Sequence, residues 1–242
     1  MTGISARPIL QGGIIAAGSG SRLRADGYRI SKPMVLVAGR PLIEHALDRF
    51  RAVGIRRLTI IINDRSEDCR RWLSDHGGDF DLDTIVRATP SSYASFRHVG
   101  DRLAGAPTVI TTIDAIMPIK DFHIFVNVAS GFTKGAVVLG LTDHVDDENP
   151  LWVTVNAADG RVRRLGGSDG SHVTAGLYWL PAQRPPAPTT KFARLRDYLG
   201  WLVAEDQPVY GIVLSRVFDI DRACDIAAAE LALGRERGNS GE

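Results

Sequence analysis

The sequence is poor in the residues that most often hold metals or build disulfide frameworks. Among 242 residues there are two cysteines, Cys69 and Cys224, which lie far apart and show no CxxC spacing. Two such thiols are typical of a cytosolic protein and predict no zinc site. The six histidines form no HxH or HxxxH pair, so they give no indication of a histidine metal site.

The sequence also lacks an excess of charge of one sign, a membrane-length apolar run and a leader-like beginning. Lys and Arg number 29 against 28 Asp and Glu, which gives a net charge of +1. This balance is not that of a nucleic-acid-binding protein, although a local basic patch stays open. No apolar run reaches about 18 residues, and the first residues, MTGISARP, lack the apolar core of a signal peptide. We therefore expect a cytoplasmic protein with no nucleic-acid or membrane partner.

What the chain does contain is an alternation of strand-like and helix-like segments. Continuous apolar runs at 13–17, 58–62 and 108–113 predict strands that are covered on both faces. Between the first two, residues 41–54 carry apolar side chains along one helical stripe and end at Gly54, a helix stop signal. Further strands are predicted at 135–142, 151–156 and 172–180, helices at 191–206 and 222–236, and a proline-rich surface connection at 181–190.

These segments predict an α/β fold. Repeated strand–helix–strand units give a parallel sheet with helices on both faces. We expect a single domain over residues 1–242, folded as a Rossmann-like three-layer sandwich with a mostly parallel, mixed central sheet and a small insertion.

A glycine-rich loop, AAGSGSR, begins where the first predicted strand ends. In open parallel sheets, ligands bind beyond the carboxyl ends of the strands. Gly18 and Gly20 let the backbone turn sharply and direct its N–H groups at an anion, while Arg22 and Lys32 can supply positive charge. The spacing matches neither the P-loop nor the dinucleotide-binding pattern. Taken alone, the loop is equally compatible with a structural strand-to-helix turn.

A longer ordered pattern surrounds this loop. It consists of Ala16-Ala17-Gly18-Ser19-Gly20-Ser21-Arg22, then Lys32-Pro33, then Gly39-Arg40-Pro41-Leu42-Ile43. The pattern resembles the nucleotidyltransferase family that makes nucleotide sugars and related activated compounds. The resemblance implies that a nucleoside triphosphate lies over the loop, with Arg22 and Lys32 acting on its phosphates as catalytic residues. The other candidate nucleotide-binding residues are Ala16, Ala17, Gly18, Ser19, Gly20, Ser21, Asn63, Ser91, Ser92 and Ser95.

The role of the three serines has two interpretations. The stretch ATPSSYASFRHVG, residues 88–100, lies where relatives place a segment against the base. Ser91, Ser92 and Ser95 can donate hydrogen bonds to a base, and each can equally cap a helix. The sequence does not indicate which base the nucleotide carries.

The implied reaction calls for Mg²⁺ or another divalent cation, which prefers carboxylate ligands. Asp114 ends an apolar run at the place where the family is similar in carrying a metal aspartate, although Ile113 stands where many members have glycine. A turn-capping aspartate is the alternative. The segment VFDIDRACDIAAAE, 217–230, resembles the family's closing element and makes Asp221 the second metal ligand, with Asp219 close behind. Asp225 is better explained by the dipole of the helix it begins.

The acceptor half resembles the family less closely. The lysine that holds the sugar phosphate in relatives is missing, and Arg163 or Arg164 either replaces it or faces solvent. The segment TAGLY, 174–178, resembles the family's Asn-Ala-Gly-Ile-Tyr strand, which lines the acceptor site, and this resemblance implies that Thr174 and Gly176 bind the acceptor. A phosphorylated sugar, another phosphorylated polyol, or an alcohol phosphate such as phosphocholine all fit as the acceptor.

The resemblance thus implies a nucleotide-binding half at about 10–130 and an acceptor-binding half, with the small insertion, at about 131–236. The expected function is transfer of a nucleoside monophosphate group from a triphosphate to a small phosphorylated acceptor, with release of pyrophosphate. One alternative is a regulatory protein that binds nucleotides or sugar nucleotides but has lost turnover. A nicotinamide-dependent oxidoreductase is disfavoured by the incomplete Gly-x-Gly-x-x-Gly pattern. The oligomeric state is not predicted.

Overall fold

The computed structural model of the protein describes residues 10–132, 135–145, 149–185 and 192–239. Its strands are β1 (Gln11–Ala16), β2 (Leu36–Val37), β3 (Arg40–Pro41), β4 (Arg57–Ile62), β5 (Asp81–Val86), β6 (Thr108–Thr112), β7 (Ala115–Ile116), β8 (Val137–Thr142), β9 (Trp152–Val155), β10 (Val162–Leu165), β11 (His172–Leu180), β12 (Val209–Leu214) and β13 (Phe218–Asp219). Its helices are α1 (Ser21–Ala25), α2 (Leu42–Ala52), α3 (Glu67–His76), α4 (Ser92–Arg102), α5 (Ile119–Ser130), α6 (Leu195–Ala204) and α7 (Ala223–Asn239), with a 3₁₀ turn at Lys32–Met34.

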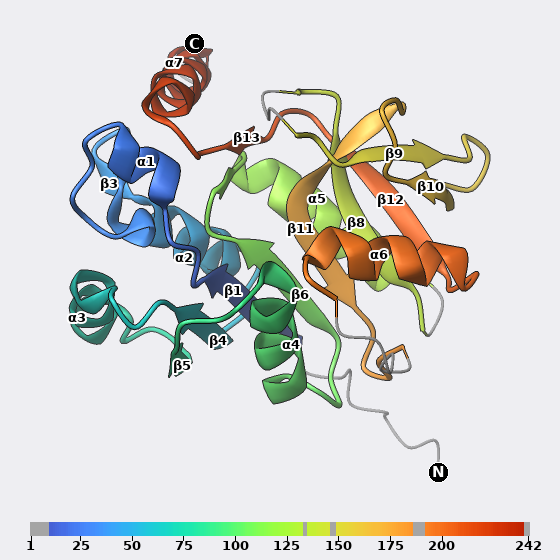
Figure 1. Ribbon diagram of the computed structural model, residues 1–242, viewed down its shortest axis with the longest axis horizontal. Coiled ribbons are helices and arrows are strands. Elements are labelled where there is room, and N and C mark those ends of the chain that lie inside the picture. The colour runs from blue at the N-terminus through green and yellow to red at the C-terminus, as the bar shows by residue number, and fades with distance from the viewer. Residues whose placement is uncertain (1–9, 133–134, 146–148, 186–191, 240–242) are drawn as a thin grey trace.

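The architecture is a nine-stranded mixed sheet between two layers of helices (Figure 1). Strand β1 pairs in parallel with β4 and β6, and β4 pairs in parallel with β5. Strand β11 pairs antiparallel with β6. It also pairs antiparallel with β8 and β9, and so joins the second half of the chain to the same sheet. Helices α4 and α6 pack with one buried cluster and α2 and α5 with the other. The predicted three-layer α/β fold with a mostly parallel, mixed sheet is confirmed.

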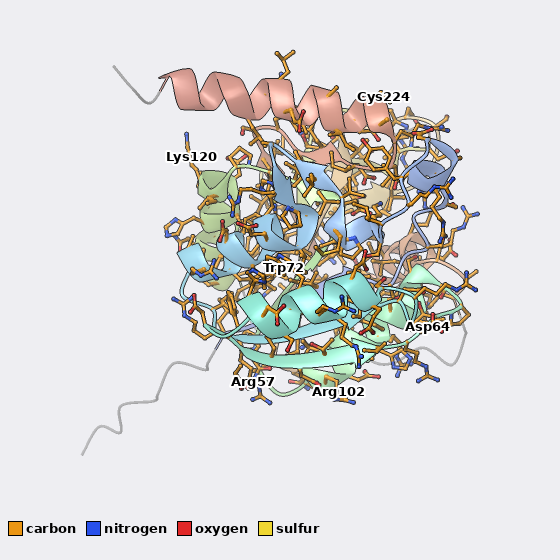
Figure 2. All side chains as sticks on the ribbon, turned by 90° about the vertical axis from the view of Figure 1, so that its left-hand side faces the viewer. Arg57, Asp64, Trp72, Arg102, Lys120 and Cys224 are labelled. Atoms are coloured by element: carbon orange, nitrogen blue, oxygen red, sulfur yellow. The ribbon has the colours of Figure 1, made fainter. Side chains whose placement is uncertain are left out.

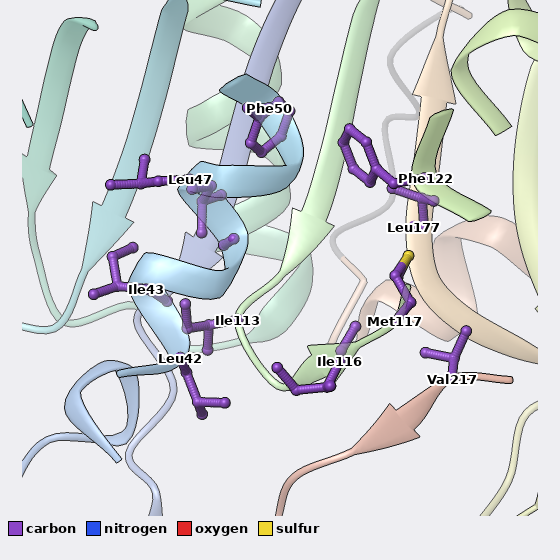
Figure 3. Close-up of a cluster of buried hydrophobic side chains, with 14 of the residues drawn as sticks. Leu42, Ile43, Leu47, Phe50, Ile113, Ile116, Met117, Phe122, Leu177 and Val217 are labelled. Carbon is purple, nitrogen blue, oxygen red and sulfur yellow. The ribbon is translucent and has the colours of Figure 1, made fainter. Parts of the chain in front are cut away.

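The apolar stripe predicted for residues 41–54 becomes the buried face of α2. Leu42, Leu47 and Phe50 lie on that face and are fully buried. Figure 3 shows this face turned toward Phe122 of α5 and toward the chain segment after β6. The rings of Phe50 and Phe122 meet edge to face, with centroids 5.1 Å apart. Ile113 packs into the same cluster, so this core supports the segment that carries Asp114.

Most predicted elements are found, with shifted ends. The first strand runs over Gln11–Ala16 rather than 13–17, and the helix predicted at 191–206 begins at Leu195. Residue 191 and the part of the proline-rich connection at 186–190 lie outside the described residues. Several elements of the structure are not predicted from the sequence. Among them, β5 is an edge strand with no fully buried residue, so its sequence carries no continuous apolar run.

Charged side chains cover the outside of this fold. Arg57, Arg102 and Lys120 extend from the ribbon at the periphery, and α7 crosses one side of the molecule with Cys224 near its start (Figure 2). Both cysteines are free, Cys69 buried and Cys224 exposed. Within the described residues, no helix has the length and apolar character needed to cross a membrane. The division into a nucleotide-binding and an acceptor-binding half stays a prediction.

The aromatic contact between α2 and α5 gives a stability prediction. We expect Phe122→Ala to lower the free energy of unfolding by about 3–5 kcal/mol, because it leaves a cavity beside Phe50. Val128→Ala is the matched control on the same helix, since Val128 is 46% exposed, and it should change stability by about 0.5 kcal/mol or less. Urea unfolding measures both, and equal losses in the two variants would contradict this description of the core.

Candidate active site

The glycine-rich loop connects β1 to the short helix α1. Gly20 adopts a left-handed backbone conformation with φ of 60°, which favours glycine. A Cβ atom added at Gly20 would lie 3.2 Å from Cβ of Lys32, whereas one added at Gly18 would meet no atom within 4 Å. The loop is therefore packed against Lys32 at one end and open at Gly18, where a ligand can approach the backbone.

Asn63 ties this loop to the neighbouring strand. Its Nδ2 donates to the carbonyl oxygen of Ala17 at 3.1 Å, and its Oδ1 accepts from the backbone N–H of Arg65. A cavity of about 300 Å³ lies here, and Gly18, Ser19 and Lys32 line it together with Asn63. These four predicted residues are thus brought around one space. Binding of a nucleotide there remains a prediction.

The three candidate serines all form bonds within the protein. Ser91 caps α4, because its hydroxyl accepts from the N–H of Ala94 at 3.1 Å. The hydroxyl of Ser92 accepts from the N–H of Leu195 at 3.0 Å and so joins α4 to α6. Ser95 is buried, and its hydroxyl lies 2.6 Å from that of Thr89. The capping interpretation of Ser91 is confirmed. Contact between any of these hydroxyls and a base stays a prediction.

Three carboxylates from two distant segments meet at the carboxyl end of β6. Strands β7 and β13 pair antiparallel, and the N–H of Ile220 donates to the carbonyl oxygen of Asp114 at 3.1 Å. This pairing brings Asp219 and Asp221 to Asp114, and one carboxylate oxygen of each lies within 4.8 Å of the others. The sequence ranked Asp221 before Asp219, but the structure places both beside Asp114.

Two cations are bonded to this cluster. The Nζ of Lys32 lies 2.8 Å from Oδ2 of Asp114 and 2.5 Å from Oδ1 of Asp221, and a guanidinium nitrogen of Arg22 donates to the other oxygen of Asp221. Burial lowers the pKa of Lys32, but the charges of Asp114, Asp219 and Asp221 outweigh it, so this pKa lies above its ordinary value. Burial raises the pKa of Asp114, and the Lys32 ammonium more than offsets it, which leaves that pKa below its usual range.

Asp225 positions the chain that carries Asp221. Its Oδ2 accepts from the backbone N–H of Asp221 at 2.8 Å and of Arg222 at 2.6 Å. These N–H groups lie immediately before the first turn of α7, where a carboxylate also complements the helix dipole. The interpretation of Asp225 as a helix-terminal residue rather than a metal ligand is therefore supported by its bonds.

A larger cavity, of about 650 Å³, opens on the other side of the carboxylates. Arg22, Asp114, Asp219 and Asp221 line it, as do the predicted acceptor residues Thr174 and Gly176, together with residues of α6. The wall at Gly176 is a bulge in β11, where the pairing with β8 shifts register. Gly176 has φ of 62°, and an added Cβ would lie 2.3 Å from the hydroxyl of Thr112. Only glycine fits this backbone.

The basic residues of this cavity are not the ones that the sequence suggested. Arg163 and Arg164 are exposed on β10 and do not line it, and Arg164 forms an ion pair with Asp169. Arg194 and Arg196, at the start of α6, do line it. Sequence reasoning missed both, because nothing in a local pattern shows which basic residue of a helix faces a cavity formed by distant strands.

The sequence profile of the MobA-like NTP transferase domain matches residues 12–172. The chain belongs to this family. The match includes the glycine-rich loop, Lys32 and Asp114, and it ends at the first residue of β11. The resemblance to nucleotidyltransferases is thereby confirmed. Asp219, Asp221 and the arginines of α6 lie beyond the matched residues.

Individual relatives agree with this assignment. The chain is 30% identical over 157 residues to a glucose-1-phosphate thymidylyltransferase from Actinoplanes sp., covering 63% of this chain and 50% of that protein. It is 29% identical over 161 residues to the bifunctional protein GlmU of Saccharophagus degradans, covering 64% and 31%. The chain thus spans half or less of the length of these curated relatives. The fold is similar to that of the inositol-1-phosphate CTP transferase from T. maritima, with a TM-score of 0.75, 17% identity, and 93% and 96% of the two chains covered.

The bonds of Asp225 give a second prediction. Asp225→Ala removes the acceptor for two backbone N–H groups before α7 and should cost about 1 kcal/mol of stability. Asp225→Asn keeps an oxygen acceptor and should retain most of that stability. Urea unfolding of both variants measures the difference. If the alanine variant proves as stable as the asparagine variant, the capping role of Asp225 is wrong.

Proposed function

We propose that the protein transfers a nucleoside monophosphate group from a nucleoside triphosphate to a small phosphorylated acceptor and releases pyrophosphate. The observation that carries this proposal is the position of the charged cluster between two cavities. Lys32 lines the smaller cavity, at the glycine-rich loop, while Asp114, Asp221 and Arg22 line the larger one. A reaction between two phosphate-bearing substrates needs such a meeting point, because both bring negative charge to it.

The carboxylates fit a divalent cation. Asp114, Asp219 and Asp221 offer three oxygen donors within 4.8 Å of one another, which is the ligand type that Mg²⁺ prefers. These three residues would hold Mg²⁺ or another divalent cation. When bound, the cation would neutralise charge on the phosphoryl oxygens and help to orient the triphosphate.

The protein's own residues have separate tasks in this reaction. The open backbone at Gly18 and Ser19, with the N–H groups of the loop, would cradle the triphosphate in the smaller cavity, and Lys32 and Arg22 would bind its phosphate oxygens. An acceptor phosphate oxygen attacks the α-phosphorus, a new oxygen–phosphorus bond forms, and the bond to the β-phosphate oxygen breaks as pyrophosphate leaves. A phosphate monoester has its second pKa at about 6, so its oxygen is already anionic at neutral pH and needs no protein base. Catalysis then rests on alignment and charge.

The acceptor would occupy the larger cavity. Its walls include the bulged strand at Thr174 and Gly176 and the start of α6. Arg196 donates to the carbonyl oxygen of Asn149 at 3.0 Å, and it forms no ion pair with another described residue. Burial and the charges of Asp114 and Asp219 raise the pKa of Tyr178, another residue of this cavity, and the Arg196 guanidinium acts in the opposite direction. We assign Arg196, assisted by Arg194, to the anionic group of the acceptor.

The structure bears on the alternative of a binding protein without turnover. Ile113 stands beside Asp114 where many family members have glycine, and this departure from the family pattern favours the alternative. Its side chain is 3% exposed, belongs to the buried cluster of Figure 3 and does not line either cavity. It therefore leaves the space around Asp114 open, and the catalytic proposal is the better supported one.

The proposal is tested first by binding and then by turnover. ATP, GTP, CTP, UTP and dTTP are screened by melting temperature with Mg²⁺ and with EDTA, because binding to the folded state raises that temperature. The triphosphate that stabilises the protein is then incubated with a panel of phosphorylated acceptors, and pyrophosphate is measured. We expect one triphosphate to stabilise the protein in a metal-dependent way and to yield pyrophosphate. Stabilisation without pyrophosphate for any acceptor would favour the regulatory alternative.

Asp114→Asn tests the metal aspartate. It keeps the shape of the side chain but removes a charge, so we expect pyrophosphate release to fall by roughly a hundredfold or more. Asp83→Asn is the matched control, because Asp83 pairs with Arg102 at the exposed edge strand β5. It should keep activity near that of the unchanged protein. Near-normal turnover by Asp114→Asn, with the fold intact by circular dichroism, would remove Asp114 from the mechanism.

Arg196→Gln tests the acceptor side. Loss of a charged hydrogen bond to an anion costs about 1.5–3 kcal/mol, so the KM for the acceptor should rise by at least about tenfold, with the KM for the triphosphate little changed. Arg164→Gln removes the same charge from the position that the sequence suggested, outside the cavity, and should leave both constants unchanged. If Arg164→Gln raised the acceptor KM and Arg196→Gln did not, the anion would be bound at β10 instead.

A further inference from the structure

Lys32 is bonded to the same oxygens that would bind a divalent cation. Its Nζ takes one oxygen of Asp114 and one of Asp221, and Arg22 takes the second oxygen of Asp221. An ammonium and a divalent cation that bind the same carboxylate oxygens repel each other and compete for those oxygens. We propose that Lys32 and Arg22 compete with the divalent cation for the carboxylates, so that cation and triphosphate bind strongly only together. This inference rests on the proposed function and concerns the regulation of the same site.

The charges of the cluster explain why neither the divalent cation nor the triphosphate would bind strongly alone. Three carboxylates face two cations, so most of their charge is already neutralised within the protein. A divalent cation that arrives alone must break ion pairs of a buried lysine, and the ammonium would then lie buried without a partner. A triphosphate that arrives alone must draw the Lys32 ammonium away from the carboxylates. The carboxylates then keep an uncompensated negative charge, which repels the nearby triphosphate.

The position of Lys32 allows an exchange of partners. The residue stands in the 3₁₀ turn Lys32–Met34, and the preceding N–H, that of Ser31, donates to Oδ2 of Asp68 on α3 at 2.9 Å. This hydrogen bond holds the backbone next to Lys32 against α3, and the lysine side chain has four carbons with rotatable bonds beyond it. Lys32 lines the smaller cavity as well as contacting Asp114 and Asp221. Its ammonium can therefore pass from carboxylate to phosphate oxygens by a change of side-chain rotamer.

Together these features make each ligand help the other. Phosphate oxygens supply a new partner for Lys32 and Arg22, and this frees the carboxylate oxygens for the cation. The cation in turn neutralises the carboxylates that would repel the triphosphate. Such reciprocal effects are a coupling free energy between two ligands, and couplings of this kind commonly change affinity by about 5–150-fold. The two ligands could also help each other only because they bind side by side. Competition by Lys32 differs from that explanation in one prediction, that removal of the Lys32 charge should strengthen binding of the divalent cation alone.

The experiment measures Mn²⁺ binding by electron paramagnetic resonance and calorimetry, with and without the triphosphate selected by the melting-temperature screen. For the unchanged protein we expect the triphosphate to tighten Mn²⁺ binding by about tenfold or more. For Lys32→Gln we expect Mn²⁺ alone to bind about tenfold tighter than it binds the unchanged protein, and the effect of the triphosphate on Mn²⁺ binding to shrink. Circular dichroism and the melting temperature establish that the variant is folded.

Two further variants sharpen the test. Arg22→Gln removes a more exposed cation and should tighten binding of Mn²⁺ alone by a smaller factor, which keeps the inference testable if Lys32→Gln does not fold. Arg24→Gln is the matched control, because Arg24 lies on the same helix but donates to the carbonyl oxygen of Ser19 and to none of the three carboxylates. Because Arg24 also lines the smaller cavity, it is a control for the metal alone, and this variant should leave the affinity for Mn²⁺ without triphosphate unchanged.

The outcomes separate this inference from the proposed function. If the protein releases pyrophosphate but the folded Lys32→Gln and Arg22→Gln variants bind Mn²⁺ no tighter than the unchanged protein, only the competition is wrong. An equal gain in Arg24→Gln would also overturn it, since a general loss of positive charge would then explain the effect. If the unchanged protein binds neither Mn²⁺ nor any triphosphate, alone or together, both the proposed function and this inference fail.

Discussion

The ion pairs of Lys32 are the interaction on which the rest of the site depends. A buried ammonium is costly unless charged groups surround it, and Lys32 meets this requirement with carboxylates that lie 82 and 189 residues away in the chain. Three segments must therefore converge: the 3₁₀ turn after the glycine-rich loop, the turn after β6, and the start of α7. The pairing of β7 with β13 fixes two of them relative to each other. The third, the 3₁₀ turn, is held to α3 by the hydrogen bond from the Ser31 N–H to Asp68, and the ion pairs of Lys32 join it to the other two.

The strand pairing of the sheet explains why two cavities border this charged cluster. The parallel strands β1, β4 and β6 end at one edge, which places the glycine-rich loop and Asp114 side by side. Strand β11 then pairs antiparallel with β6 and adds the bulged wall at Gly176 next to Asp114. The change from parallel to antiparallel pairing thus lets Lys32 line the smaller cavity while the carboxylates near it line the larger one.

The sequence predicted the parts of this site that depend on local pattern. The apolar runs of β1, β4 and β6, the turn at Gly20, and an aspartate at the end of β6 all follow from neighbouring residues. The arginines of α6 do not, because they become relevant only when a helix packs beside strands from another part of the chain. The sequence also did not show that Asp219 lies beside Asp114 together with Asp221, since this depends on how β13 pairs with β7. The hydroxyl of Ser92 shows the same limit, as its partner is the N–H of Leu195.

Arg164 and Arg196 differ in where they place a positive charge relative to the larger cavity. A hairpin and a helix both border the second half of the sheet, but only the helix contributes basic residues to the larger cavity among the described residues of these two elements. On β10 the guanidinium of Arg164 forms an exposed ion pair with Asp169, so its charge is partly neutralised at the surface. On α6, Arg196 donates to a neutral carbonyl oxygen, and among the described residues no carboxylate forms an ion pair with it. Under the proposed function, positive charge for the acceptor comes from the helix, and the missing lysine of the hairpin is no obstacle to binding a phosphate.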